Sequence, residues 1–498
     1  MLADQIKKAI LAESEKLIER YHGYHNALHL EHTRKSRRVI SVESKEIKTP
    51  AEWSHHVLHN PFYVRRKAAA IANSIAKKIG AGVYVPHKPF PKTVPKKGGG
   101  ERPISIYQIP DAAISTMFYQ NLLEKNLHRF SSFSYAYRND RNVHFAIQDI
   151  AIELEGSNRT FIAEFDFSDF FGSISHEYLE EQLTRNGYLI SPNDRQIIKA
   201  FLNAGTGKGI PQGTSISLFL ANLVCWELDK GLEGCGVKFA RYADDTVIWT
   251  SEYSKICDAF KCIADFSKKT HVKINADKSH GIHILIKEGM RSEMQAKYSF
   301  DFLGYKLSVG AVSIKDARVS KIKADICRIL FKHLVQPLTY TPLRALIIPS
   351  SGEDKSLISA MGEIRRYLYG GLTSQQISNF VAGRTKHIYF KGLMSYYPLV
   401  NDINQLRQLD GWLVSAIYRA VQQRGKLLAG HGYGSRLSSF PFNVAKKDML
   451  QDYGRIVVKR KKLYEIPSLS LLHSALTQAV KEVGIKRVMN PKSIFYDY

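Results

Sequence analysis

The stretch VKFARYADDTVIWT, residues 237–250, constrains the fold of this chain more than any other. Apolar residues flank a central Asp244–Asp245 pair on both sides, a pattern that predicts a β-hairpin with the aspartates near its tip. Asp is a common turn residue, which makes an ordinary turn one explanation. The other is a metal site, because two like charges at the edge of a buried strand repel each other unless a cation neutralises them.

A third carboxylate follows another predicted strand. In TFIAEFD, residues 160–166, apolar positions alternate and Asp166 comes last. Carboxylates are hard oxygen ligands that select Mg2+, which keeps several waters and completes its shell with substrate phosphates. Two such ions, about 3.5–4 Å apart, can hold the attacking and leaving oxygens of a phosphoryl displacement. A site for two Mg2+ ions is therefore a hypothesis, and the motifs in the rest of the chain are needed to choose between it and an ordinary turn.

Composition and charge narrow the class of protein. The chain has 498 residues, 44% of them hydrophobic, so it can form several domains with their own cores. Its net charge of +25 favours a polyanionic partner, with nucleic acid ahead of a membrane surface. No apolar run reaches the length of a membrane span. Five cysteines without a CxxC pair, and an N-terminus without a secretory signal, predict a cytoplasmic protein.

Seven stretches carry a recognisable order of motifs. In chain order they are PKKGGGERPISI (95–106), SYAYRNDRNVHFAI (134–147), FDFSDFFGSI (165–174), GIPQGTSISLFLANL (209–223), YADD (242–245), INADKS (274–279) and FLGY (302–305). Together they resemble the bacterial reverse transcriptases of the retron, group II intron and defence-associated types. Seven matches in the family's order make a very specific signal. The resemblance implies an α+β, right-hand polymerase fold with fingers, a palm with an antiparallel sheet, and a helical thumb.

The resemblance implies roles for the carboxylates and their neighbours. Asp166, Asp244 and Asp245 match the family's ligands for two Mg2+ ions, and Phe167 is assigned to the same site beside Asp166. One ion would lower the pKa of the primer hydroxyl, and the other would neutralise charge on the triphosphate. Lys278 matches the lysine proposed as general acid for pyrophosphate departure. A solvated lysine is the alternative for Lys278.

Other residues match contacts to the incoming nucleotide. The ring of Phe171 falls where the family has a steric gate, so dNTPs are expected over NTPs, with core packing as the alternative. Asp169 either meets phosphate through its backbone amide or caps the next turn, and Ser217 and Asn222 are expected to fix the local backbone. The matched triphosphate and nucleotide contacts are Lys96 or Lys97, Arg102, Gln212 and Gly213.

The motifs divide the chain into five predicted parts. These are an N-terminal helical basic extension (1–82), fingers (83–160), palm (161–310, with a fingers segment at about 175–210), a helical thumb (311–428) and a C-terminal extension (429–498). The last part contains a charge run, VVKRKKLYE, at 457–465 and ends in Tyr496 and Tyr498. Either tyrosine hydroxyl could prime DNA synthesis; the alternative is a tail that docks its aromatic rings.

The chain is thus predicted to be an RNA-directed DNA polymerase that uses two Mg2+ ions and dNTPs to make DNA on an RNA template. The resemblance further implies the defence-associated lineage, with a lean to its type nine class, an antiphage role in bacteria, a dedicated structured noncoding RNA and an RNA-bound homo-oligomer. Three alternatives stay open: template-poor or homopolymer synthesis, a non-enzymatic RNA-binding scaffold, and an RNA-copying RNA polymerase, which Phe171 disfavours.

Overall fold

The computed structural model describes residues 2–40, 42–95, 100–157, 159–202, 207–277, 279, 281–292, 294–339, 347–348, 353–385 and 388–488. The chain folds into two compact units. The first comprises Met1–Ala27, Glu46–Ile150 and Ser157–Tyr298, and the second comprises Leu28–Lys45, Ala151–Gly156 and Ser299–Tyr498. Both units combine helices with mainly antiparallel sheets, so the predicted α+β class is confirmed. The finer division into five domains stays a prediction.

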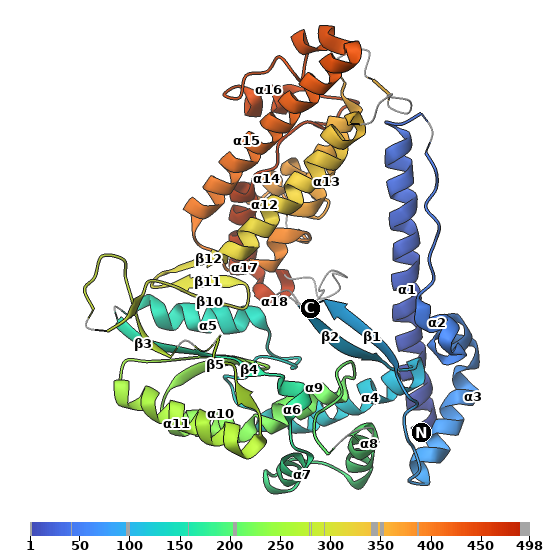
Figure 1. The fold of residues 1–498 in the computed structure, drawn as a ribbon, viewed down its shortest axis with the longest axis vertical. Coiled ribbons are helices and arrows are strands. Elements are labelled where there is room, and N and C mark those ends of the chain that lie inside the picture. The colour runs from blue at the N-terminus through green and yellow to red at the C-terminus, as the bar shows by residue number, and fades with distance from the viewer. Residues whose placement is uncertain are drawn as a thin grey trace. The chain divides into compact units, whose positions relative to one another are not determined.

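The elements up to residue 298 supply the first unit (Figure 1). They are α1 (Leu2–Ser36), α2 (Ala51–His55), η1 (Val57–His59), α3 (Pro61–Gly80), β1 (Phe90–Pro95), β2 (Glu101–Ile106), α4 (Ile109–Asn126), η2 (Leu127–Arg129), α5 (Val143–Glu155), β3 (Arg159–Phe165), β4 (Phe167–Ser168), α6 (Phe170–Ser173), α7 (His176–Arg185), α8 (Pro192–Leu202), α9 (Ile216–Val224), α10 (Trp226–Gly234), β5 (Lys238–Tyr242), β6 (Asp245–Thr250), α11 (Tyr253–Thr270), β7 (Lys273–Ile274), β8 (Ile282–Ile286) and β9 (Ala296–Lys297). The ends of α1 and α5 extend into the second unit.

A five-stranded sheet forms the centre of the first unit, in the order β5-β6-β3-β8-β9. All its pairs are antiparallel except β8 with β9. Most side chains of the central strand β3 are buried, because it has a neighbouring strand on each side. The helices α10 and α11 run along one face of the sheet, as Figure 1 shows. The predicted strand at 160–166 and the predicted hairpin at 237–250 are both confirmed.

The N-terminal helices follow local sequence signals. In α1, Ile6, Ile10 and Ile18 recur at multiples of four residues and are buried, the spacing that places side chains on one helix face. The helix α3 begins after Asn60, whose side chain accepts hydrogen bonds from the first backbone N–H groups, with Pro61 as the first helical residue. The sequence predicts a helix at 1–40 and a second at 63–79, and α1 and α3 confirm both.

One predicted helix is divided in the structure. The stretch GIPQGTSISLFLANLVCWELDK, residues 209–230, predicts a Gly/Pro loop that leads into one long apolar helix. In the structure, α9 ends at Val224 and α10 begins at Trp226, so this prediction is wrong. The hydroxyl of Tyr178 donates a hydrogen bond to the carbonyl of Val224, 3.4 Å away. A side chain that occupies a carbonyl of the helical ladder is a recognised cause of a kink. In α10, the helix after the break, Asp229 accepts a hydrogen bond from Arg241 of the sheet strand β5.

The second unit is built mainly from helices (Figure 1). Its elements are β10 (Phe300–Phe302), β11 (Tyr305–Ser308), β12 (Ala311–Ile314), α12 (Asp316–Leu330), the π-helical η3 (Phe331–Val335), η4 (Gln336–Leu338), α13 (Lys355–Tyr369), α14 (Ser374–Val381), η5 (Leu393–Tyr396), α15 (Ile403–Leu428), the π-helical η6 (Ala429–Tyr433), η7 (Gly434–Ser438), α16 (Met449–Arg455), α17 (Leu469–Val483) and α18 (Ile485–Val488). The strands form one antiparallel sheet in the order β10-β11-β12.

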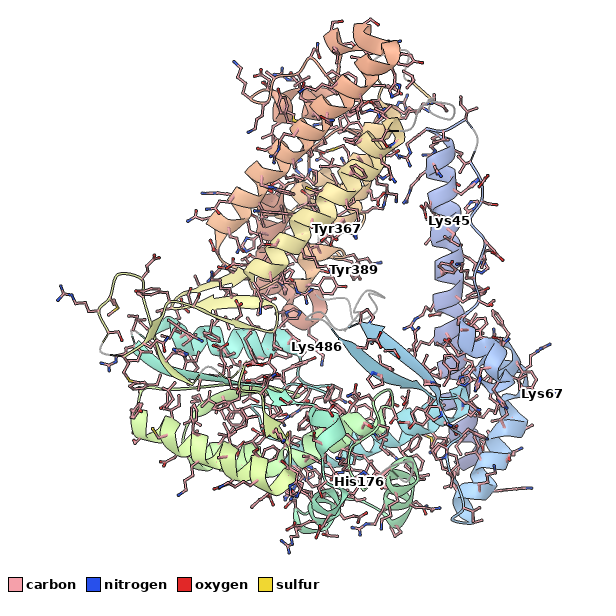
Figure 2. The ribbon with its side chains drawn as sticks, in the orientation of Figure 1. Lys45, Lys67, His176, Tyr367, Tyr389 and Lys486 are labelled. Atoms are coloured by element: carbon pink, nitrogen blue, oxygen red, sulfur yellow. The ribbon has the colours of Figure 1, made fainter. Side chains whose placement is uncertain are left out.

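Hydrogen bonds between distant residues hold these helices together. Tyr367 of α13, which Figure 2 labels, donates its hydroxyl hydrogen to Asp325 of α12 over 3.2 Å. Asp410 of α15 accepts from the backbone N–H groups of Leu469 and Ser470 at the start of α17. Of the described helices, none is long and apolar enough to cross a membrane.

Candidate active site

The strand register brings the predicted metal ligands to one end of the central sheet. Phe165, the last residue of β3, pairs with Thr246 of β6, so Asp166 leaves β3 beside the position where Asp245 begins β6. The strands β5 and β6 pair down to Tyr242 and Asp245, which leaves only Ala243 and Asp244 in the turn. Residues 79 positions apart in sequence therefore meet at one sheet edge, and all three carboxylates lie there partly exposed.

A segment after β7 fixes the first of these carboxylates. The side chain of Asn275 donates a hydrogen bond to Asp166 Oδ2 over 3.0 Å, and its backbone N–H donates to the carbonyl of Asp166 over 2.8 Å. The backbone N–H of Asp166 in turn donates to Ser279 Oγ, 3.3 Å away. Both partners belong to the INADKS motif, from which sequence reasoning selected only Lys278. The motif thus also orients a candidate metal ligand.

The turn between β5 and β6 has an unusual backbone. Ala243 has φ of 61°, in the left-handed region that glycine adopts most readily. A β-carbon there costs roughly 1–2 kcal/mol. Strain of this kind persists where the surrounding structure holds it, and it is frequent at functional sites. The residue before the acidic pair is therefore kept in place by contacts outside the turn.

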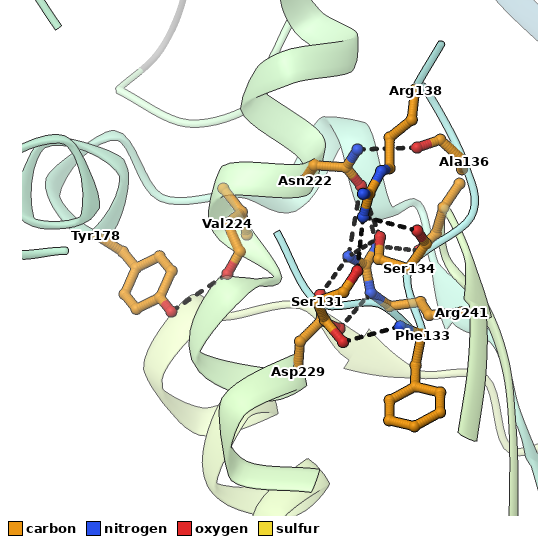
Figure 3. Close-up of polar contacts among 11 residues, drawn as sticks. Ser131, Phe133, Ser134, Ala136, Arg138, Tyr178, Asn222, Val224, Asp229 and Arg241 are labelled. Atoms are coloured by element: carbon orange, nitrogen blue, oxygen red, sulfur yellow. Dashed lines mark hydrogen bonds and ion pairs between the residues drawn. The ribbon is translucent and has the colours of Figure 1, made fainter. Parts of the chain in front are cut away.

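A fully buried arginine, Arg241 of β5, supplies those contacts, and Figure 3 shows it between Asp229, Ser134 and Asn222. Its Nη1 donates to the carbonyl of Ala243 over 3.1 Å. Its Nε and Nη2 donate to the two carboxylate oxygens of Asp229, at 2.6 and 2.7 Å. Nη2 also donates to Ser134 Oγ at 2.8 Å, and Asn222 Oδ1 lies 3.3 Å from Nη1. Burial alone would lower the pKa of Arg241, but the charge of Asp229 outweighs it and raises that pKa.

This arginine network explains two motifs that carry no catalytic group. The start of the SYAYR motif pairs with β5. The carbonyl of Phe133 accepts a hydrogen bond from the N–H of Arg241, and the N–H of Tyr135 donates to the carbonyl of Arg241, both at 2.9 Å. Asn222 of α9 donates to the carbonyl of Ala136 over 2.9 Å, as Figure 3 shows. Its predicted role in fixing the backbone is confirmed. Sequence reasoning missed Arg241, although a charge in a strand of core residues requires a buried partner.

The loop before α9 forms backbone hydrogen bonds with β2 and with the turn that follows Asp166. Gln212 accepts a hydrogen bond through its carbonyl from the N–H of Ser105 in β2, 3.1 Å away. Gly213 has φ of 110°, and a β-carbon there would come within 2.2 Å of the Ser105 carbonyl, so only glycine fits. On the other side, the N–H of Ile210 donates to the carbonyl of Phe171 over 2.7 Å. The loop therefore connects the β1–β2 hairpin with the turn that follows Asp166.

Two further residues shape this region. His176, labelled in Figure 2, donates from Nε2 to the carbonyl of Gly209 over 2.6 Å and so holds the start of the loop. Ser217 Oγ donates to the carbonyl of Pro211 over 2.7 Å, which confirms its predicted role in fixing the backbone.

Asp169 precedes α6 with φ of 44° and makes no side-chain cap. That geometry removes the capping alternative for its side chain.

The aromatic residues after Asp166 differ in burial. Phe167 is buried and pairs with Ile274 of β7. Phe171 is only partly buried and packs edge-on against Phe170, with ring centroids 5.6 Å apart. A ring that is neither buried in the core nor fully solvated remains compatible with both the gate and the packing interpretations.

Some predicted residues cannot be placed. Lys96, Lys97, Lys278, Tyr496 and Tyr498 lie outside the described residues. For Arg102 the structure describes the backbone, which lies in β2 opposite Val94. Within the described ranges, His, Cys, Asp and Glu side chains form no group of three that could hold a metal ion by themselves. A metal at this sheet edge would therefore take part of its shell from water or substrate, which Mg2+ commonly does.

Comparison with known proteins identifies this region. Residues 94–307 match the family model described as reverse transcriptase (RNA-dependent DNA polymerase), so this part of the chain is similar to that family. The retron Ec86 reverse transcriptase of Escherichia coli is 29% identical over 195 residues, which cover 38% of this chain and 57% of that protein. The group II intron-encoded protein LtrA of Lactococcus lactis is 28% identical over 207 residues, which cover 39% of this chain and 33% of LtrA.

Among solved structures, apo telomerase from Candida Tropicalis aligns with a TM-score of 0.37 and 12% identity, over 77% of this chain and 71% of that one. The chain spans between 20% and 57% of the length of the curated relatives it matches. The family match covers the central sheet and its flanking helices, and the predicted right-hand polymerase fold is confirmed.

Proposed function

We propose that this chain is an RNA-directed DNA polymerase. The observation that carries the proposal is the strand register, which delivers Asp166, Asp244 and Asp245 to one sheet edge inside the region that matches reverse transcriptases. Paired acidic strand ends in such a domain are suited to phosphoryl transfer, because divalent cations can link them to a triphosphate. The substrates we propose are dNTPs, an RNA template and a primer hydroxyl.

We propose that two Mg2+ ions bind at this edge, with water and substrate completing their shells. The three carboxylates are hard oxygen donors, and we assign them as ligands together with the backbone of Phe167. Bound there, the ions would supply charge neutralisation and activation of the primer hydroxyl. The chain's own contribution is orientation: Asn275 fixes Asp166, and Arg241 fixes the turn that carries the other two carboxylates. Such preorganisation is what electrostatic catalysis requires.

Residues around the loop before α9 would receive the nucleotide. We assign triphosphate contacts to Arg102 and to Lys96 or Lys97, the incoming nucleotide to Gln212 and Gly213, and proton donation to the pyrophosphate to Lys278. Support comes from the position of the loop, whose backbone bonds reach β2 and the Phe171 turn. Phe171 would exclude a ribose 2′-OH, so we expect dNTPs to be preferred.

The biological setting is also a proposal. A net charge of +25 supports an RNA partner, and the resemblance to defence-associated enzymes supports a dedicated noncoding RNA, an RNA-bound oligomer and an antiphage role in the bacterial cytoplasm. We keep Tyr496 and Tyr498 as candidate priming residues, to be tested by mass spectrometry of the tail peptide after incubation with dNTPs. A tail without a nucleotide adduct would end that part of the proposal.

The experiment is primer extension on an RNA template with all four dNTPs and Mg2+, beside the Asp244→Asn variant. Wild-type protein should extend the primer, and the variant should lose at least about 1,000-fold in rate, because it removes one oxygen donor of the metal site. Melting temperature and RNA binding should be unchanged, which separates lost chemistry from lost folding. Equal extension by the variant would overturn the site assignment, and wild-type protein that binds RNA without extending any primer would favour the scaffold alternative.

A further inference from the structure

A second charged feature lies outside the region that matches reverse transcriptases. Residues 455–462, RIVVKRKK, carry five cations and no acid. We call this segment the basic hairpin. Its five cationic residues, Arg455, Lys459, Arg460, Lys461 and Lys462, are all exposed. A run of charge is usually a solvated surface, so the local geometry decides whether it has a role.

The tip of the basic hairpin is a tight turn with an unusual sequence. Val458 and Lys461 exchange two backbone hydrogen bonds of 2.9 Å, which leaves Lys459 and Arg460 as the turn residues. Their φ angles are 47° and 62°. Two positive φ angles are typical of a type I′ turn, which strongly prefers Asn-Gly. Two long cationic side chains at these positions work against local backbone preference, because a β-carbon is strained at positive φ.

Buried contacts directly after the basic hairpin, at Tyr464 and Glu465, fix it to its unit. Arg365 of α13 donates through Nη2 to the carbonyl of Glu465 over 2.8 Å. The ring of Tyr464 is fully buried, and its hydroxyl accepts a hydrogen bond of 2.9 Å from the backbone N–H of Asp354. Asp354 is itself paired with Arg424 inside the unit. Buried hydrogen bonds therefore anchor the basic hairpin to the helices of its unit.

Charge without local compensation determines the kind of partner. In the part of the chain that the structure describes, no acid forms an ion pair with any of the five cations. Five cations on eight residues repel one another, and a polyanion with closely spaced charges would relieve that repulsion. The nucleic-acid backbone has such spacing, and neutralising its phosphates releases counterions. Neither the strained turn nor its buried anchoring is needed for a merely soluble surface.

We infer that the basic hairpin binds the sugar–phosphate backbone of nucleic acid. The inference stands on charge and geometry outside residues 94–307, so it does not depend on polymerase activity. The interaction is expected to be independent of base sequence, because cations that meet phosphates carry no sequence information. Its signature is the salt dependence of binding.

The test compares two doubly substituted proteins with wild type. Lys459→Asn/Arg460→Gly gives the turn its preferred residues, so folding should be preserved while two cations are removed. Lys446→Gln/Lys447→Gln removes two exposed cations from elsewhere in the same unit and is the matched control for net charge. Each full-length protein is titrated into a fluorescein-labelled 30-nucleotide RNA of mixed sequence, without Mg2+ or dNTPs, at several KCl concentrations.

We expect the slope of log K against log salt to fall in magnitude by about 1.4 for the turn variant, close to 0.7 for each phosphate of the single strand that is no longer neutralised, with roughly tenfold weaker binding at moderate salt. The control should keep the wild-type slope within experimental error. A turn variant that keeps the wild-type slope would overturn the inference and leave an acidic protein as the alternative partner. An equal fall in both variants would also overturn it, because the effect would then reflect net charge alone. Since no synthesis is measured, failure here is distinct from failure of the proposed polymerase.

Discussion

Within the described residues, each compact unit contains a buried Arg–Asp ion pair, and the two pairs have different roles. In the first unit Arg241 meets Asp229, and in the second Arg424 meets Asp354, with a shortest distance of 2.6 Å in both and all four side chains at most 1% exposed. Buried pairs of this kind add little net stability, because desolvation offsets the attraction. What distinguishes the two is therefore where their remaining hydrogen bonds go.

The remaining bonds of Arg241 reach the candidate site, whereas those of the second pair reach helix ends. Arg241 holds the carbonyl of Ala243, one residue before the acidic pair. Arg424 donates to the carbonyl of Leu334 over 3.2 Å, and Asp354 caps α13 by accepting from Ser356 and Leu357. The same kind of ion pair thus positions a candidate catalytic turn in the first unit and joins helices in the second.

Removing either arginine should produce the largest effect on stability. Arg241→Met and Arg424→Met each leave a buried aspartate without its partner, and we expect each to cost about 3–5 kcal/mol in the unit that contains it. Hydrogen exchange followed by mass spectrometry separates the units, since peptides from each report their own opening. Equal loss of protection in both units for both variants would contradict the assignment of each pair to one unit.

Conservative substitution should separate the two roles by activity. Arg241→Lys keeps a charge beside Asp229 but cannot also reach Ala243, Ser134 and Asn222, since lysine lacks the planar fork. We expect its rate of primer extension at saturating dNTP to fall roughly 10- to 100-fold, with a nearly unchanged KM for dNTP. Arg424→Lys should stay within about threefold of wild type at a temperature where both variants are folded. Similar rates for both would mean that the first pair is also only structural.

Relieving the strained turn should have a smaller effect. In Ala243→Gly, removal of the β-carbon at φ of 61° relieves strain in the folded state, whereas glycine raises the conformational entropy of the unfolded chain. Because these effects offset each other, the free energy of unfolding should change by less than about 1 kcal/mol. Ala243→Val is the matched opposite, because a β-branched residue tolerates this backbone worst, and it should cost about 1–2 kcal/mol. Urea denaturation measures both, and a valine variant as stable as wild type would show that the turn is not strained.

The smallest effect concerns a buried thiol beside the network. Burial raises the pKa of Cys225, between α9 and α10, to about 12, so native protein at pH 8 should leave it unalkylated while the exposed Cys257 and Cys327 react. The Arg241→Met variant should label Cys225 several-fold faster, and Arg424→Met should not, because only the first opens this region. Mass spectrometry of the peptides after iodoacetamide treatment measures the labelling of Cys225 in both variants. Equal labelling of Cys225 in the two variants would contradict the different roles of the two ion pairs.

Much of the fold follows from local sequence, whereas the support of the site does not. Alternation at 160–166 and the paired runs around the aspartates predict β3 and the β5–β6 hairpin, because strand patterns are local. The bond between Asn275 and Asp166 joins residues 109 positions apart, and no periodicity reveals it. The ion pair of Arg241 with Asp229 likewise joins side chains on two different elements, β5 and α10. Side-chain partners across elements come from tertiary packing.

The Mg2+ dependence of single-nucleotide incorporation on an RNA template tests the central claim most directly. That claim is that Arg241 holds the turn which carries Asp244 and Asp245 to the metal site. For Arg241→Lys, beside Arg424→Lys as control, it predicts a half-saturating Mg2+ concentration several-fold above wild type, a lower maximal rate and unchanged template affinity. An Arg241→Lys protein with the wild-type Mg2+ profile and maximal rate would contradict the account.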